Sequence, residues 1–193
     1  MTVIINPPGA MDFEPALDLQ DIMGTWYVTH STLPMWKKNK DVTITYTARA
    51  DPSSTAEEQP VQIDDVVEYR GKAKPVSSKR TRIVGVDTVE ASSADPSSSS
   101  SSSPPSTRFK WRGSGLLFPL TSRWQLLGYA SDETPWAVTY FEKTLFTPEG
   151  IDIYARSKEG LPEGLLAEIK EGLKQVGGKV GELAGELFEV ERS

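Results

Sequence analysis

The chain has 193 residues, a net charge of −6 at pH 7 and no cysteine. This length favours one domain, and the acidic balance provides no basic surface for nucleic acid. The missing cysteines exclude disulfides, thiolate metal sites and cysteine nucleophiles. Since His30 is the only histidine, a metal site built from several histidines is excluded as well, and we expect neither a metal nor a cofactor.

Residues 1–16 are interrupted by prolines and a glycine, which predicts an irregular arm. They contain no basic segment followed by an apolar core, as a signal peptide would. No apolar run in the chain has the length of a membrane helix. Together with the missing cysteines, these features predict a cytoplasmic protein without stable membrane insertion.

A short helical turn is expected just before Gly24, and a strand follows over 24–31. The alternation of a strand places four side chains on one face: Gly24, Trp26, Val28 and His30. A glycine beside a large aromatic residue lets another segment approach the backbone while the ring fills a wide space. This strand is therefore the expected starting point of the core.

Further strand-like runs follow, with short connections and no helices between them. Their approximate ranges are 42–49, 61–70, 80–89, 107–112, 122–130, 136–145 and 150–157. The apolar pattern changes parity around Asp64 and Asp65, which predicts a β-bulge, and Gly85 suggests a kink. The stretch 91–106 includes seven consecutive serines, which predicts a disordered loop inside one domain.

Strands that follow one another in this way predict an all-β antiparallel meander, and closure into an eight-stranded up-and-down barrel removes its exposed edges. From about 162 to 187 the pattern becomes that of an amphipathic helix, expected to pack on the outside of the barrel. Gly177 and Gly178 weaken this helix, and Phe188 begins a possible short final strand. The whole domain covers about 17–190.

Several short segments occur in a specific order along the chain. They are Gly24-Thr25-Trp26-Tyr27, Leu33-Pro34-Met35-Trp36, Ser131-Asp132-Glu133, the strand 150–157 with Arg156 near its end, and Leu161-Pro162-Glu163. In this order and spacing the chain resembles the lipocalin family of the calycin superfamily. The missing signal peptide and cysteines make it most similar to intracellular bacterial and fungal lipocalin-like proteins. Its Ser131-Asp132-Glu133 turn departs from the family's usual Thr-Asp-Tyr.

The resemblance implies that Gly24, Trp26 and Arg156 form the closed base of the barrel, with the guanidinium over the indole face. It also implies an interior that holds one small ligand. The expected ligand contacts are Val28, His30, Met35, Trp36, Tyr46, Trp111, Trp124, Tyr140 and Tyr154. For the last four aromatic residues, core packing is an equally good interpretation.

Two main functions are compatible with such an interior. The first is the binding of a small hydrophobic molecule, such as a fatty acid, a terpenoid or a polyketide-like compound. The alternative is a cofactor-free isomerase or cyclase, of the pericyclase type, that serves small-molecule biosynthesis with His30 as acid or base. A haem barrel with His30 as axial ligand is a poor match for one histidine on the first strand. The oligomeric state is left open.

Overall fold

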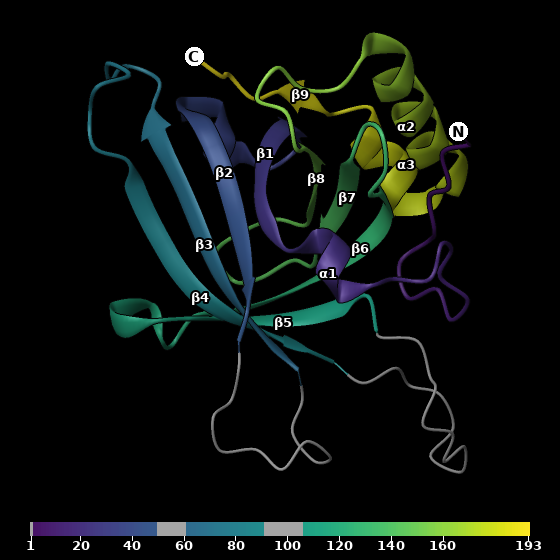
Figure 1. Ribbon diagram of the computed structural model, residues 1–193, viewed down its shortest axis with the longest axis horizontal. Helices are drawn as coiled ribbons and strands as arrows, with labels where there is room; N and C mark the ends of the chain where they lie inside the picture. The colour runs from purple at the N-terminus through teal and green to yellow at the C-terminus, as the bar shows by residue number, and fades with distance from the viewer. Residues whose placement is uncertain (1, 50–60, 91–105) are drawn as a thin grey trace.

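The computed structural model describes residues 2–49, 61–90 and 106–193. In this part of the chain eight antiparallel strands close into a barrel, because β1 pairs with both β2 and β8 (Figure 1). The strands are β1 (Gly24–Ser31), β2 (Asn39–Ala48), β3 (Gln62–Gly71), β4 (Thr81–Val89), β5 (Arg108–Gly113), β6 (Thr121–Ala130), β7 (Trp136–Phe141) and β8 (Gly150–Ala155). The predicted eight-stranded barrel is confirmed. Apart from Ser106, the predicted serine-rich loop lies outside the described residues.

Apolar side chains from every second position along the strands fill the barrel interior. In β2, Ile44 and Tyr46 are buried, whereas Thr47 between Tyr46 and the strand end is exposed. Trp26 of β1 lies opposite Ile44 in register, so both side chains join the same inner cluster. β-Branched and aromatic residues suit this pleated, one-sided burial.

One end of the barrel is closed, and we call this end the base. The polar groups of Trp26 and Arg156 at the base are in contact with partners inside the chain. The guanidinium carbon of Arg156 lies 3.5 Å from the centre of the Trp26 ring. Its nitrogens donate to three backbone carbonyls, those of Asp21, Met23 and Thr25. The Trp26 indole donates to the carbonyl of Ile22, the last residue of α1 (Leu19–Ile22), at 2.8 Å. Arg156, which directly follows β8, therefore links the end of the last barrel strand to the segment at the start of β1.

Two helices cover the outside of β7 and β8: α2 (Glu163–Val176) and α3 (Gly178–Ala184) (Figure 1). Their apolar side chains, such as Ile169 and Leu173, pack against Ile151 and Ile153 in a second core cluster. The expected single helix is divided at Gly177, whose φ of 72° ends α2. The predicted outer helical segment is thus present as a bent pair.

The C-terminal end of the described chain returns to the barrel as β9 (Phe188–Glu189). This short strand pairs with β1 at His30 and Ser31, and Glu191 makes a parallel bridge with Lys40 of β2. It therefore fills the gap that opens between β1 and β2. No helix within the described ranges is both long enough and apolar enough to cross a membrane.

A β-bulge in β1 reverses the expected orientation of His30. Val28 pairs with Tyr154, which faces the interior, but the register then shifts and His30 pairs with Ile153 of the outer cluster. The charged groups that act on His30 are Lys170, Glu189 and Arg192, from α2 and the C-terminal segment. The structure thus corrects the prediction that His30 faces the cavity: the extra residue of a bulge changes the parity of all that follows.

The expected bulge in β3 is absent, since β3 pairs with β4 in unbroken register from Gln62 to Tyr69. The parity change in the sequence arises because Asp65 occupies an inward, buried position. Gly85 lies opposite Asp65 on β4. It does not form the expected kink but allows the Trp111 ring to pack closely on the strand. A Cβ there would lie 2.1 Å from Nε1 of Trp111, so only glycine lets this indole lie on the strand.

Candidate functional site

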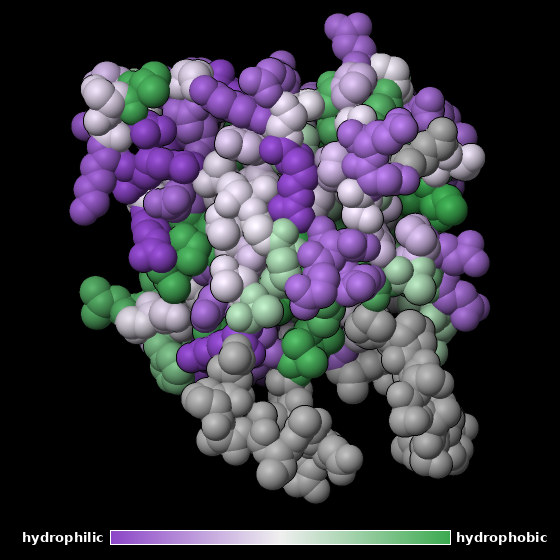
Figure 2. All heavy atoms as spheres, viewed as in Figure 1, coloured by the Kyte–Doolittle hydropathy of each residue, from purple (hydrophilic) through white to green (hydrophobic). Residues whose placement is uncertain are grey.

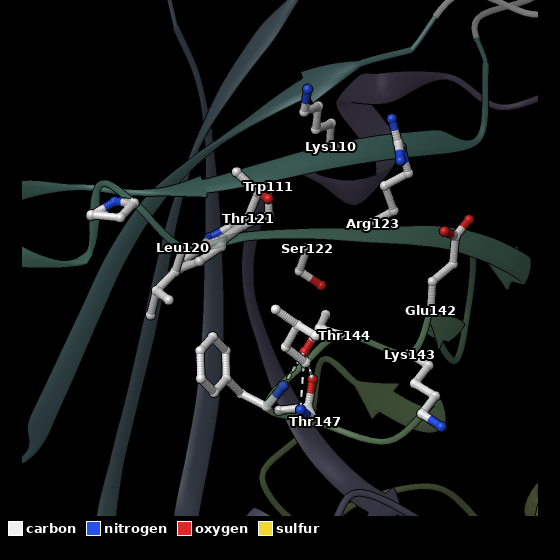
Figure 3. Close-up of a pocket in the computed structure, with 13 residues that line it drawn as sticks. Lys110, Trp111, Leu120, Thr121, Ser122, Arg123, Glu142, Lys143, Thr144 and Thr147 are labelled. Carbon is white, nitrogen blue, oxygen red and sulfur yellow. Dashed lines mark hydrogen bonds between the residues drawn. The ribbon is translucent and has the colours of Figure 1, made fainter.

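A cavity of about 690 Å³ lies at the end of the barrel opposite the base. We call it the mouth cavity. It lies between β5, β6 and the loop that joins β7 to β8; its lining includes Trp111, Leu120, Ser122, Thr144, Phe146 and Thr147. In Figure 3, Ser122 points toward Thr144 across the space, whereas Lys110 and Arg123 point away from it. Its walls combine apolar rings and aliphatic groups with hydroxyls, and two further charged residues, Glu142 and Lys143, complete the lining.

The rim of the mouth cavity carries exposed apolar side chains. Leu145 and Phe146 project from the β7–β8 loop, and Leu116 and Phe118 from the loop after β5. In Figure 2, apolar atoms project at the edge where Figure 1 places the loop after β5, beside a largely polar surface. Large exposed apolar groups around a concavity are typical of ligand-binding entrances.

Trp111 connects the mouth cavity to the barrel interior. Its ring lines the cavity and lies on Gly85. Its side chain also acts on Asp65, the residue opposite Gly85 in register, and lowers the pKa of that carboxyl against the effect of burial. Because Asp87 is paired with Trp111 across β4 and β5, the indole stands directly beside two buried carboxyls.

Asp65 and Asp87 form a pair of carboxyls on the inner face, which we call the acid pair. Asp65 is 7% exposed and Asp87 is 0% exposed. Burial raises the pKa of Asp87 to about 7, against a hydrogen bond of 2.8 Å from the Trp124 indole that lowers it. Burial and the neighbouring Asp87 raise the pKa of Asp65 well above its usual range. Near neutral pH the pair therefore holds a proton.

Aromatic rings and hydroxyls surround the acid pair. Trp124 is stacked between Phe109, at 4.2 Å between ring centres, and Tyr46, at 5.6 Å. Burial raises the pKa of Tyr46, and its neighbours Tyr154, Asp65 and Asp87 raise it further. A void of about 10 Å³, about the space of one water molecule, lies among the rings of Trp26, Tyr46, Trp124 and Tyr154, and neither aspartate lines it.

A third buried carboxyl, Asp152, lies elsewhere on the inner face. Its two oxygens accept hydrogen bonds from the Ser31 hydroxyl and, at 3.4 Å, from the Trp36 indole. Burial raises its pKa to about 7, while both hydrogen bonds lower it. Ser31 also accepts the backbone N–H of Leu33, so Asp152 fixes the start of the β1–β2 connection.

The structure gathers six of the nine expected contact residues on the inner face of the barrel. They are Val28, Trp36, Tyr46, Trp111, Trp124 and Tyr154. Met35 is 39% exposed on the short helix η1 (Pro34–Lys38). Tyr140 packs with the outer cluster and donates to Glu149 at 2.7 Å, and His30 lies on the outer face. Only Trp111 among the nine lines the mouth cavity.

The sequence reading missed the acid pair, because a strand with a polar inward residue does not show simple alternation. The parity change around Asp65 predicts a bulge instead, and Asp87, two residues after Gly85, belongs to no recognisable motif. One signal was available. Keeping strict alternation through 61–70 places Asp65 on the same face as Ile63 and Val67.

Fold and cavity together define this protein as a lipocalin-like barrel with an open mouth. No protein-family model matches the sequence, and no curated protein matches it. Among solved structures, the chain is similar to lobster apocrustacyanin A1, with a TM-score of 0.56, 14% identity and coverage of 99% of this chain and 91% of that one. It is also similar to the amine-binding protein of Rhodnius prolixus, solved as its tryptamine complex. The TM-score is 0.57 and the identity 16%, with coverage of 98% of this chain and 86% of that one. A third similar structure is insecticyanin of the tobacco hornworm Manduca sexta. Its TM-score is 0.54 and its identity 12%, with coverage of 99% of this chain and 90% of that one. At these identities the similarity is one of fold.

Proposed function

We propose that this protein is a lipocalin-type carrier that binds one small, largely apolar molecule in the mouth cavity. The observation that carries the proposal is the cavity of about 690 Å³ that opens beside Trp111. Its volume lies within the range of about 300–1,000 Å³ typical of small-molecule sites. Its rings and aliphatic walls suit a terpenoid, polyketide-like or fatty-acyl body, whose burial provides most of the binding free energy.

The similar folds support this proposal. One of these proteins was solved with tryptamine bound, so a barrel of this architecture accommodates a small molecule. The resemblance of the motifs around Gly24 and Arg156 to those of the lipocalin family supports the same class. The fold alone does not select the ligand, so the selection has to come from the side chains in and behind the cavity.

Filling the mouth cavity tests the proposal. Calorimetric titration of the full chain with a fatty acid, a terpenoid alcohol and an aromatic polyketide should give saturable binding of at least one of them. Ser122→Trp places a ring in the cavity and should weaken that binding at least tenfold. Thr47→Trp, at an exposed position of β2, is the matched control and should leave it unchanged. Equal binding by both variants would contradict a site in this cavity.

A second candidate function is an isomerase or cyclase that uses the same cavity. The observation that favours it is the acid pair, in which Asp87 has a pKa of about 7 and can hold or release a proton near neutral pH. His30 has no place in this candidate, since it lies on the outer face. Conversion of a polyene substrate by the wild type, with loss of conversion in Asp87→Asn, would support the enzyme. Binding without product would leave the carrier.

A further inference from the structure

The interior behind Trp111 contains polar atoms that lack a hydrogen-bond partner within the described structure. They are Oδ1 of Asp65, Oδ2 of Asp87, the hydroxyl oxygen of Thr139 and the hydroxyl oxygen of Tyr154. The residues that carry them are at most 7% exposed. Buried polar atoms in folded proteins are nearly always paired, so several unpaired atoms in one interior indicate a partner that is not part of the chain.

The acid pair offers acceptors without a cation. In the described part of the chain, the groups that act on the two carboxyls are each other and the indoles of Trp111 and Trp124. The Trp124 indole supplies one N–H to Oδ1 of Asp87, whereas Oδ2 of Asp87 and Oδ1 of Asp65 stay without a partner. No third carboxyl or imidazole joins them into a metal-binding group among the residues described. The missing partner is therefore a donor with more than one hydrogen atom.

Charge and surroundings narrow the chemistry of that donor. A protonated amine carries two or three N–H groups and a positive charge, so it can bridge both open oxygens and replace the proton that the pair otherwise holds. The ring of Trp111, which lines the mouth cavity beside the pair, also attracts a cation. A hydroxyl offers a single donor and no charge, and a carboxylate head group would be repelled.

We propose that Asp65 and Asp87 anchor the protonated amine of a ligand whose apolar body occupies the mouth cavity. This inference rests on the proposed function and names the class of its ligand. The amine reaches the acid pair past Trp111, which lines the cavity and lies on Gly85, the partner of Asp65 in register. The void of about 10 Å³ farther inside is lined by neither aspartate and is too small for an aromatic or aliphatic body, so that part of the ligand stays in the mouth cavity.

The test compares two probes that differ in one group, 2-naphthylethylamine and 2-naphthylethanol. Both are titrated by calorimetry at pH 7.5 into the full-length wild type, Asp65→Asn, Asp87→Asn and Asp152→Asn. The wild type should bind the amine at least tenfold more tightly than the alcohol, because hydrogen bonds to a charged group are the strong ones. Either acid-pair variant should lose this preference while its affinity for the alcohol stays within about twofold.

Asp152→Asn is the matched control, since Asp152 is also buried and bonded to an indole but has a partner on each oxygen. It should keep the amine preference. Equal affinity of the wild type for the two probes would overturn the inference and leave the proposed function standing. An amine preference that survives in both acid-pair variants would also overturn it. If neither probe binds and Ser122→Trp changes nothing for any ligand, the proposed function fails together with the inference. Thermal unfolding of each variant verifies that it is folded.

Discussion

Two regions of the barrel interior contain buried aspartates, and they differ in how completely those aspartates are bonded. Asp152 and the acid pair share the same inner face and a raised pKa, and an indole N–H donates to Asp152 and to Asp87. Both oxygens of Asp152 accept a hydrogen bond. One oxygen of Asp65 and one of Asp87 accept none.

The difference separates structure from function within a single cavity. A carboxyl with all its partners inside the chain is part of the framework, as is the base formed by Trp26 and Arg156. A carboxyl left open in a buried site destabilises the free protein and becomes favourable only when something binds. The comparison therefore predicts that substitutions in the first region reduce stability, whereas those in the second reduce ligand binding.

The largest effect is expected at the base. Trp26→Ala removes a side chain that is 1% exposed, together with the ring beneath the Arg156 guanidinium. The free energy of unfolding should fall by about 3–5 kcal/mol, as is usual when a buried aromatic residue is truncated. Urea unfolding at pH 6 measures it. Thr47→Ala, at an exposed site, serves as the control, and a loss at Trp26 below about 1 kcal/mol would show that the base is not part of the framework.

The next effect is expected at Asp152. Asp152→Ala leaves the Ser31 hydroxyl and the Trp36 indole without their acceptor. This should lower the free energy of unfolding by about 1–3 kcal/mol. Hydrogen exchange should also become faster at the Leu33 amide, which Ser31 holds. If Asp152→Ala unfolds at the same urea concentration as the wild type, the distinction between the two regions is lost.

The dependence of stability on pH follows from the raised pKa values of the three buried carboxyls. In the folded state they keep their protons to a higher pH than in the unfolded state, where their pKa is about 3.9. Their contribution is therefore complete below about pH 4 and is lost as pH rises toward 7, at up to about 1.4 kcal/mol per pH unit for each carboxyl.

The titration of His30 changes stability with pH in the opposite direction. Burial, with Lys170 and Arg192, lowers its pKa to about 4, so it favours folding as pH rises from about 4 to 6.5. The useful measurement is therefore the difference between wild type and Asp87→Asn in urea unfolding at pH 5 and pH 8. The wild type should lose more stability than the variant over this interval. A wild type that loses less would mean that Asp87 is charged in the folded protein at pH 5.

The sequence predicted the parts of this comparison that depend on alternation and order. The eight strands, the outer helical segment and the inward position of Tyr46 follow from apolar periods that the structure keeps. His30 could not be placed, because the bulge after Val28 depends on pairing with β8, more than 100 residues away. Strict alternation places Asp65 on the inner face, but its association with Asp87 could not be recognised, since it depends on indoles from β5 and β6 that reach the two carboxyls only in the closed barrel.

The smallest expected effect gives the sharpest comparison, because the same substitution should have opposite signs in the two regions. In Asp87→Asn, the amide oxygen can still accept from Trp124, and the amide nitrogen replaces the open oxygen and can donate to the neighbouring Asp65. Stability at pH 7.5 should therefore stay the same or rise by about 1 kcal/mol. In Asp152→Asn, the amide nitrogen must face the donor of either Ser31 or Trp36, so stability should fall. Urea unfolding of the two variants under identical conditions tests this comparison. If the free energy of unfolding falls in both variants, the acid pair belongs to the framework. If it rises in Asp87→Asn alone, the acid pair is the site that the free protein leaves unsatisfied for its ligand.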